Sequence, residues 1–222
     1  MQFHVWGSVS VILFFFTGYG LFHQYKILRD RRQVGIPGYT RNLSAQQFVT
    51  SFAAFFSIFF LGLTRAQFNH YLVWTRLSAL VLVIAILWEI YLDRRSLSSL
   101  VSVILAAIVL TLGIIPILLR PLPFAIDISA HLLTVIIAVI LAYGNLHQIH
   151  LLGTASNTPL SQRLLWSLLV KDLATLGFGL TMSLAESWSL LLLNASSLCL
   201  KSYMLIQVIA LGDRDSRRRK RD

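Results

Sequence analysis

The stretch YGLFHQYKIL, residues 19–28, decides the architecture, because the chain contains it twice. It returns as YGNLHQIHLL, residues 143–152, with Tyr, Gly, His, Gln and the final Leu in register at an offset of 124 positions. Two further blocks recur in the same order at an offset of 117 positions, Leu-Ser at 43–44 and 160–161 and Gly-Leu-Thr at 62–64 and 179–181. Ordered blocks at a nearly constant offset predict one structural unit that occurs twice, with a shorter loop inside the second copy.

The amino-acid composition indicates that lipid is the solvent for most of the surface. Of 222 residues, 56% are hydrophobic and only 13% are charged, and the mean hydropathy is +0.72. A water-soluble domain usually carries about 25% charged residues, so this chain has too few to cover a globule. The net charge of +10 is concentrated in loops and in the tail, beside apolar segments. That distribution is typical of topology determinants, and we expect no nucleic-acid partner.

Membrane-spanning segments are the main feature of the chain. A span needs about 20 mainly apolar residues, and seven segments qualify, approximately 5–26, 44–64, 71–92, 97–119, 128–150, 164–182 and 188–211. Backbone N–H and C=O groups in hydrocarbon need hydrogen-bond partners, which a helix provides within one segment and a closed barrel provides between strands. No segment here shows the alternation of apolar and polar residues that is typical of a barrel strand. The sequence therefore predicts an all-α polytopic membrane protein with seven transmembrane helices.

The basic residues predict the orientation in the bilayer. They fall between segments one and two, three and four, and five and six, and in the tail, whereas the opposite side has only Arg65 and Arg120. The positive-inside rule then places the N-terminus outside and the C-terminus in the cytoplasm, with the plasma (inner) membrane as the expected host. The basic tail, 212–222, is a run of like charge, so we expect it to be disordered and to lie against anionic lipid.

The repeat and the spans together predict a three-plus-one-plus-three organisation. Residues 1–96 form the first three-helix repeat, 97–125 a linker helix, and 126–211 the second repeat. An odd number of helices per unit would invert the second copy, and the single linker span restores a parallel arrangement. Both His-Gln motifs then end an outside-to-inside helix at the cytoplasmic boundary.

These motifs carry a family resemblance. His23-Gln24 precedes a basic loop and Asn42-Leu43-Ser44, and His147-Gln148 precedes a loop and Pro159-Leu160-Ser161. The pattern resembles the PQ-loop superfamily, which includes the SWEET sugar transporters. The resemblance implies two parallel three-helix repeats with a solute cavity between them. Both family prolines are His here, which removes the expected hinge, so the alternative is a non-transporting receptor or scaffold on the same fold.

Charged and polar groups inside the spans are the candidate solute contacts, because charges in lipid are costly and mark a function or a specific pairing. We expect these residues at a substrate cavity: Asn194, Arg76, Trp74, Lys201, Asp172 and Lys171. Lys171 and Asp172 point about 100° apart on a helix and cannot share one face, and similar depth favours a pair between Asp172 and Lys201. Arg76 would favour an anionic or carboxylate-bearing solute, or it snorkels outward. A purely structural charge network is the other interpretation.

A second set lies toward the cytoplasmic ends of the spans, His23, Gln24, His147, Gln148 and Glu89. Imidazoles titrate near neutral pH, so these residues are candidates for a gate or for proton coupling, although a His at a helix end more often bonds a carbonyl or a headgroup. His131 has the same ambiguity.

Other functional classes fit the sequence less well. No metal-ligand spacing, phosphate loop or nucleophile elbow is present, so we expect no metal, no cofactor and no enzyme. A retinal-binding rhodopsin with a Schiff base at Lys201 is disfavoured, because Ser197 stands where an acidic partner would be. The sequence thus predicts transport of a small polar metabolite (sugar, amino acid or carboxylate), with proton coupling and homo-oligomerisation left open.

Overall fold

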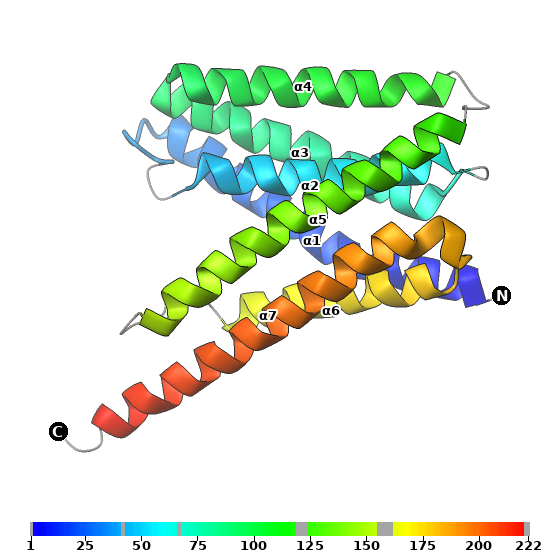
Figure 1. Ribbon diagram of the computed structural model, residues 1–222. Coiled ribbons are helices and arrows are strands. Elements are labelled where there is room, and N and C mark those ends of the chain that lie inside the picture. Colours follow the sequence, from blue (N-terminus) through cyan, green and yellow to red (C-terminus); the bar gives the residue numbers. More distant parts are fainter. Residues whose placement is uncertain (1, 41–42, 66–67, 119–123, 155–161, 220–222) are drawn as a thin grey trace. The chain divides into compact units, whose positions relative to one another are not determined.

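The computed structural model describes residues 2–40, 43–65, 68–118, 124–154 and 162–219. These residues form seven helices and no strand (Figure 1). The helices are α1 (Gln2–Gln33), α2 (Ala45–Thr64), α3 (His70–Arg94), α4 (Leu97–Leu118), α5 (Phe124–Thr154), α6 (Gln162–Leu180) and α7 (Leu184–Arg219). The prediction of an all-α chain is therefore confirmed for the described part of the sequence.

Six of the described helices, α1 to α5 and α7, are long and apolar enough to cross a membrane. The predicted sixth span is the exception, because α6 has 19 residues and three of them are charged, Arg163, Lys171 and Asp172. Any stretch of α6 that approaches the required length of about 20 residues includes this charge. The chain is a multi-span integral membrane protein with six candidate spans and one helix, α6, that is too polar to qualify alone.

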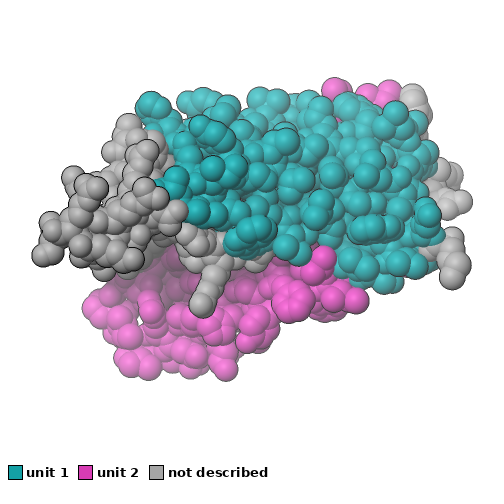
Figure 2. Space-filling view, turned by 90° about the horizontal axis from the view of Figure 1, so that it is seen from below, with its two compact units in different colours: residues 1–10, 135–222 teal, residues 11–134 magenta. Residues whose placement is uncertain are grey.

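The chain divides into two compact units (Figure 2). Unit 2 comprises residues 11–134, and unit 1 comprises residues 1–10 and 135–222. Two helices contribute to both units: α1 passes from unit 1 to unit 2 after Ser10, and α5 passes from unit 2 to unit 1 after Thr134.

The core of unit 2 is apolar and lies among α2, α3 and α4. Its buried members come from all three helices, Phe52, Phe59, Leu63, Val73, Leu80, Val83, Leu87, Val103, Ala106 and Leu110. Both α2 and α3 begin at a capping side chain, since the Ser44 hydroxyl accepts from the Gln47 amide at 3.3 Å and the Asn69 side chain accepts from the Leu72 amide at 3.2 Å. Such caps satisfy amides that would otherwise lack a partner in the first turn. Helix α1 joins this unit through Leu28, which packs with Ile86 and Ile90 of α3.

Unit 1 is built on the hairpin of α6 and α7. Leu165 and Leu169 of α6 form a buried cluster with Met204, Leu205 and Val208 of α7. The start of α1 packs on the far end of α6, where Phe3 lies 5.2 Å from Phe178 between ring centroids.

Helix α7 is longer than the sequence analysis predicted. It continues to Arg219, so residues 212–219 are helical where we expected disorder, and residues 220–222 lie outside the described part. Extending an existing helix avoids the cost of nucleation. The sequence also places Asp213 and Asp215 four residues before Arg217 and Arg219, a spacing that favours a helix.

Candidate functional site

A group of four polar residues lies between α6 and α7, and we refer to Lys171, Asp172, Ser197 and Lys201 as the α6–α7 centre. The Asp172 carboxylate accepts from Lys201 Nζ at 2.6 Å and from the Ser197 hydroxyl at 2.8 Å. Its other oxygen lies 2.8 Å from Lys171 Nζ. The predicted pair between Asp172 and Lys201 is therefore confirmed.

Helical periodicity places this centre in the interface of the hairpin. Side chains three and four positions apart share one face of a helix, and the centre falls within such a series on both helices. On α6 the series is Leu165, Leu169, Asp172, Leu176 and Gly179, and on α7 it is Ser187, Leu190, Asn194, Ser197, Lys201, Met204 and Val208. The middle of an otherwise largely apolar interface thus carries two ammonium groups and one carboxylate.

Lys171 corrects one detail of the sequence analysis. We expected adjacent residues to point apart, yet Lys171 and Asp172 are paired at 2.8 Å. The helical geometry holds for the Cα–Cβ directions, but the four-carbon stem of a lysine is flexible enough to bring the ammonium group back to its neighbour. Both lysines consequently share the same carboxylate.

Exposure differs within the centre. The side chain of Asp172 is 2% exposed, whereas those of Lys171 and Lys201 are 19% and 16% exposed. Of the charged side chains in the α6–α7 centre, the two lysines are therefore the partly exposed ones. Asn194 lies on the same face of α7, one turn before Ser197, but it is buried and its amide donates to the Leu190 carbonyl at 2.8 Å.

Arg76 and Trp74 belong to unit 2, whereas the other four predicted cavity residues belong to unit 1. Arg76 does not snorkel outward, because it is only 1% exposed. Its guanidinium carbon lies 4.1 Å from the centroid of the Phe14 ring, and its Nη1 donates to the Thr75 hydroxyl at 2.9 Å. An aromatic face attracts a cation, so Arg76 is held inside the unit. Trp74 is exposed and donates to His70 Nδ1 at 3.1 Å.

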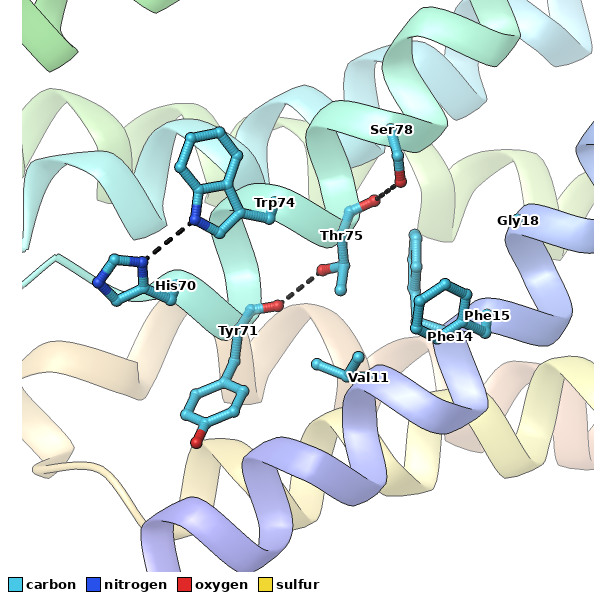
Figure 3. A pocket seen from close by; sticks show the side chains of 9 residues that line it. All are labelled: Val11, Phe14, Phe15, Gly18, His70, Tyr71, Trp74, Thr75 and Ser78. Atoms are coloured by element: carbon cyan, nitrogen blue, oxygen red, sulfur yellow. Dashed lines mark hydrogen bonds between the residues drawn. The ribbon is translucent and has the colours of Figure 1, made fainter.

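A pocket of about 400 Å³ lies between α1 and α3 in unit 2 (Figure 3). Helix α1 contributes Val11, Phe14, Phe15 and Gly18, and α3 contributes His70, Tyr71, Trp74, Thr75 and Ser78. The hydroxyls of Thr75 and Ser78 are occupied by carbonyls of their own helix. The lining is mainly apolar and aromatic, and the described residues around this pocket include no Asp, Glu, Lys or Arg.

Glu89 is held by the last turn of α1 and by the loop that follows it. Its carboxylate lies 3.4 Å from Arg32 Nη1 and accepts from the Tyr39 hydroxyl at 3.2 Å. The next residue of this loop, Thr40, donates to Asp93 through its amide at 2.8 Å and its hydroxyl at 2.6 Å. Burial, together with the negative charges of Glu89 and Asp93, raises the pKa of Tyr39 from 10.0 to about 12. These contacts make Glu89 an anchor for the loop in this structure.

Of the two His-Gln motifs, the structure describes the side chains of the first. His23 is exposed and stacks on Tyr19, one turn earlier, with 6.1 Å between ring centroids, and Gln24 is half-buried. The side chains of His147 and Gln148 lie outside the described residues, although their backbone belongs to α5.

A second ionic cluster was not anticipated. Arg65 is buried, and its Nη1 lies 3.2 Å from His131 Nε2 and 3.6 Å from an Asp127 oxygen. The Thr64 hydroxyl donates to the same oxygen at 3.1 Å. From the sequence, Arg65 was interpreted as a loop charge. The spacing of Asp127 and His131, four residues apart in the first turns of α5, could have indicated a polar cluster. Among the described residues, no group of three His, Cys, Asp or Glu side chains is placed to hold a metal ion.

Known proteins do not assign this chain to a family. The chain matches no protein-family model, no curated protein and no solved structure.

Proposed function

We propose that this protein is a membrane transporter of a small polar metabolite and that the solute binds at the α6–α7 centre. The observation that carries the proposal is a charged group of residues in the middle of the α6–α7 hairpin, in which both lysine side chains are partly exposed. Charged residues at membrane depth are costly and commonly mark a substrate pathway. In transporters built from repeats, solute sites commonly lie near the bilayer midplane.

The contrast between the two helix hairpins supports a functional role for this charge. In the proposed repeat, α2 and α3 correspond to α6 and α7. Helix α2 contains no charged residue, and its contact with α3 is an apolar core. A hairpin of this type therefore folds without a buried ion pair. The charge of α6 is an additional feature of the second hairpin, and replacing a buried ion pair by apolar residues is often neutral or stabilising.

Two glycines support the repeat itself. Gly62 of α2 and Gly179 of α6 are the recurring glycines of the Gly-Leu-Thr blocks. A Cβ atom on Gly62 would lie 2.9 Å from Leu72 of α3, and one on Gly179 would lie 2.9 Å from Leu191 of α7. Gly62 thus permits close approach of α2 and α3, and Gly179 lies at the same end of its hairpin against the tip of a leucine side chain of α7, as expected if the two hairpins are copies of one unit.

The second candidate is a non-transporting membrane receptor or scaffold. It is favoured by the pairing of buried carboxylates: Glu89 with Arg32 and Tyr39, and Asp172 with two lysines. A paired network can be purely structural.

Uptake into proteoliposomes separates the two candidates. Sugars, amino acids and small carboxylates are each offered with and without a pH gradient. Transport predicts saturable uptake of at least one class, strong loss in Lys201→Gln, and full activity in Lys26→Gln, which changes an exposed lysine of α1 by the same chemistry. Flat traces for every solute, from protein that is folded by circular dichroism, would favour the scaffold.

A further inference from the structure

We propose that Lys171 and Lys201 together bind the carboxylate of the transported solute, so that the substrates are small monocarboxylates. This inference rests on the proposed transport function and names the substrate class of the same site.

The α6–α7 centre carries an excess positive charge. Two ammonium groups share one carboxylate, which leaves one positive charge in excess. The other parts of unit 1, residues 2–10 and 135–154, contain no Asp, Glu, Lys or Arg. Along α6 and α7 the nearest charges at one end of the hairpin are Arg163 and Asp213, eight and twelve residues away, or about 12 and 18 Å along a helix, and the nearest at the other end is Glu186, fifteen residues before Lys201, or about 22 Å. The excess charge is therefore local to the α6–α7 centre.

The two lysines also have more hydrogen-bond donors than Asp172 uses. An ammonium group has three N–H donors and no acceptor. Among the described residues, Asp172 is the one side chain bonded to either ammonium. Four donors in total thus have no protein partner in the described part of the chain, and both lysine side chains are partly exposed while Asp172 is buried.

The positions of the two ammonium groups suit a carboxylate ligand. Lys171 approaches one oxygen of Asp172 at 2.8 Å, and Lys201 approaches the other at 2.6 Å. The two ammonium groups are therefore spaced to bracket a carboxylate. A second carboxylate on the accessible side can bridge the same pair and form charge-assisted hydrogen bonds, which are about twice as strong as neutral ones.

The size of the excess charge selects among anions. One monocarboxylate neutralises the centre, and neutrality is favoured because a net charge in a low-dielectric site is costly. Phosphate monoesters carry a charge of about −1.5 to −2 at pH 7 and would leave a negative excess. A neutral sugar would leave the positive charge uncompensated.

The test is binding to the purified, full-length protein in zwitterionic lipid nanodiscs, measured by calorimetry. Acetate and lactate are compared with acetamide and lactamide, which have the same shape without the charge, and with inorganic phosphate. We expect binding of the carboxylates at least tenfold tighter than that of the amides. Loss of one charge-assisted bond corresponds to about a tenfold change or more, so Lys171→Gln and Lys201→Gln should each weaken carboxylate binding at least tenfold. Lys26→Gln is the matched control and should bind normally.

Several results would overturn the inference: equal binding of amides and carboxylates, unchanged affinity in both lysine variants, or tighter binding of phosphate. Displacement of acetate by anionic lipid in the nanodisc would assign the centre to a lipid headgroup and reject a solute. Circular dichroism identifies an unfolded variant, and Lys201→Arg, which keeps the charge, should then retain binding. Carboxylate binding without uptake would reject transport alone, whereas uptake of neutral solutes without carboxylate binding would reject this inference alone.

Discussion

Replacement of Asp172 by Asn should destabilise the protein more than replacement of either lysine. Asp172 is the shared acceptor of three donors at 2.6 to 2.8 Å and is 2% exposed. The Asn side chain would leave two neighbouring ammonium groups without a counter-charge. Removing one partner of a buried ion pair costs about 3–5 kcal/mol. Each lysine variant instead leaves Asp172 with a remaining lysine and loses one charge-assisted bond, worth at most about 1.5–3 kcal/mol, and less here because both lysine side chains are partly exposed.

Thermal unfolding in detergent measures this difference. For a chain of this length, a loss of 1 kcal/mol lowers Tm by about 2–4 °C, so Asp172→Asn should lower Tm by about 6–20 °C. The double variant Asp172→Asn, Lys201→Gln should partly recover, since only one unpaired ammonium group remains. Asp30→Asn, which neutralises an exposed carboxylate in α1, is the matched control. The reasoning fails if Asp172→Asn melts no lower than Lys201→Gln.

Two further predictions concern unit 2. Gly62→Ala should cost about 1–3 kcal/mol of folding stability by overpacking, because the added Cβ would lie 2.9 Å from Leu72 and 3.1 Å from Val73. Gly20→Ala is the control, since Gly20 has open space around it, and it should be neutral or slightly stabilising. Equal Tm values for the two variants would contradict the close approach of α2 and α3. The pKa of Tyr39 is raised to about 12, so the folded state retains the phenolic proton, and the resulting stability is complete below pH 10 and lost as the pH rises through 12. A tyrosinate absorbance titration should therefore show a late-titrating group that Tyr39→Phe removes, and an unchanged titration curve would reject the contact with Glu89.

The helices and one long-range contact could be predicted from sequence. Apolar segments in lipid must form helices, because no other structure short of a barrel satisfies their backbone. The Asp172–Lys201 pair followed from depth, since charges at similar depth on neighbouring helices are the partners that remove each other's cost. Ser197 was also accessible to this reasoning, because it lies one turn before Lys201 on the same face.

Other features depend on details that periodicity does not encode. The position of Glu89 depends on the course of the loop that brings Tyr39 to α3, and loop paths have no sequence period. Arg76 is buried because Phe14 of α1 covers it, which depends on how two helices pack. The sixth span was predicted because Lys171 and Asp172 stand among apolar residues. The sequence nevertheless contains no stretch of the required length in α6 that is free of charged residues.

Uptake of lactate by proteoliposomes tests the central claim most directly, because it asks whether the α6–α7 centre handles a solute or only joins two helices. The wild-type protein is compared with Lys171→Gln and with the exposed control Lys26→Gln, at equal amounts of folded protein. We predict saturable uptake in the wild type and the control and at least a tenfold loss in Lys171→Gln, with Tm changed far less than by Asp172→Asn. Uptake that is absent in the wild type, or that Lys171→Gln leaves intact, would contradict the account.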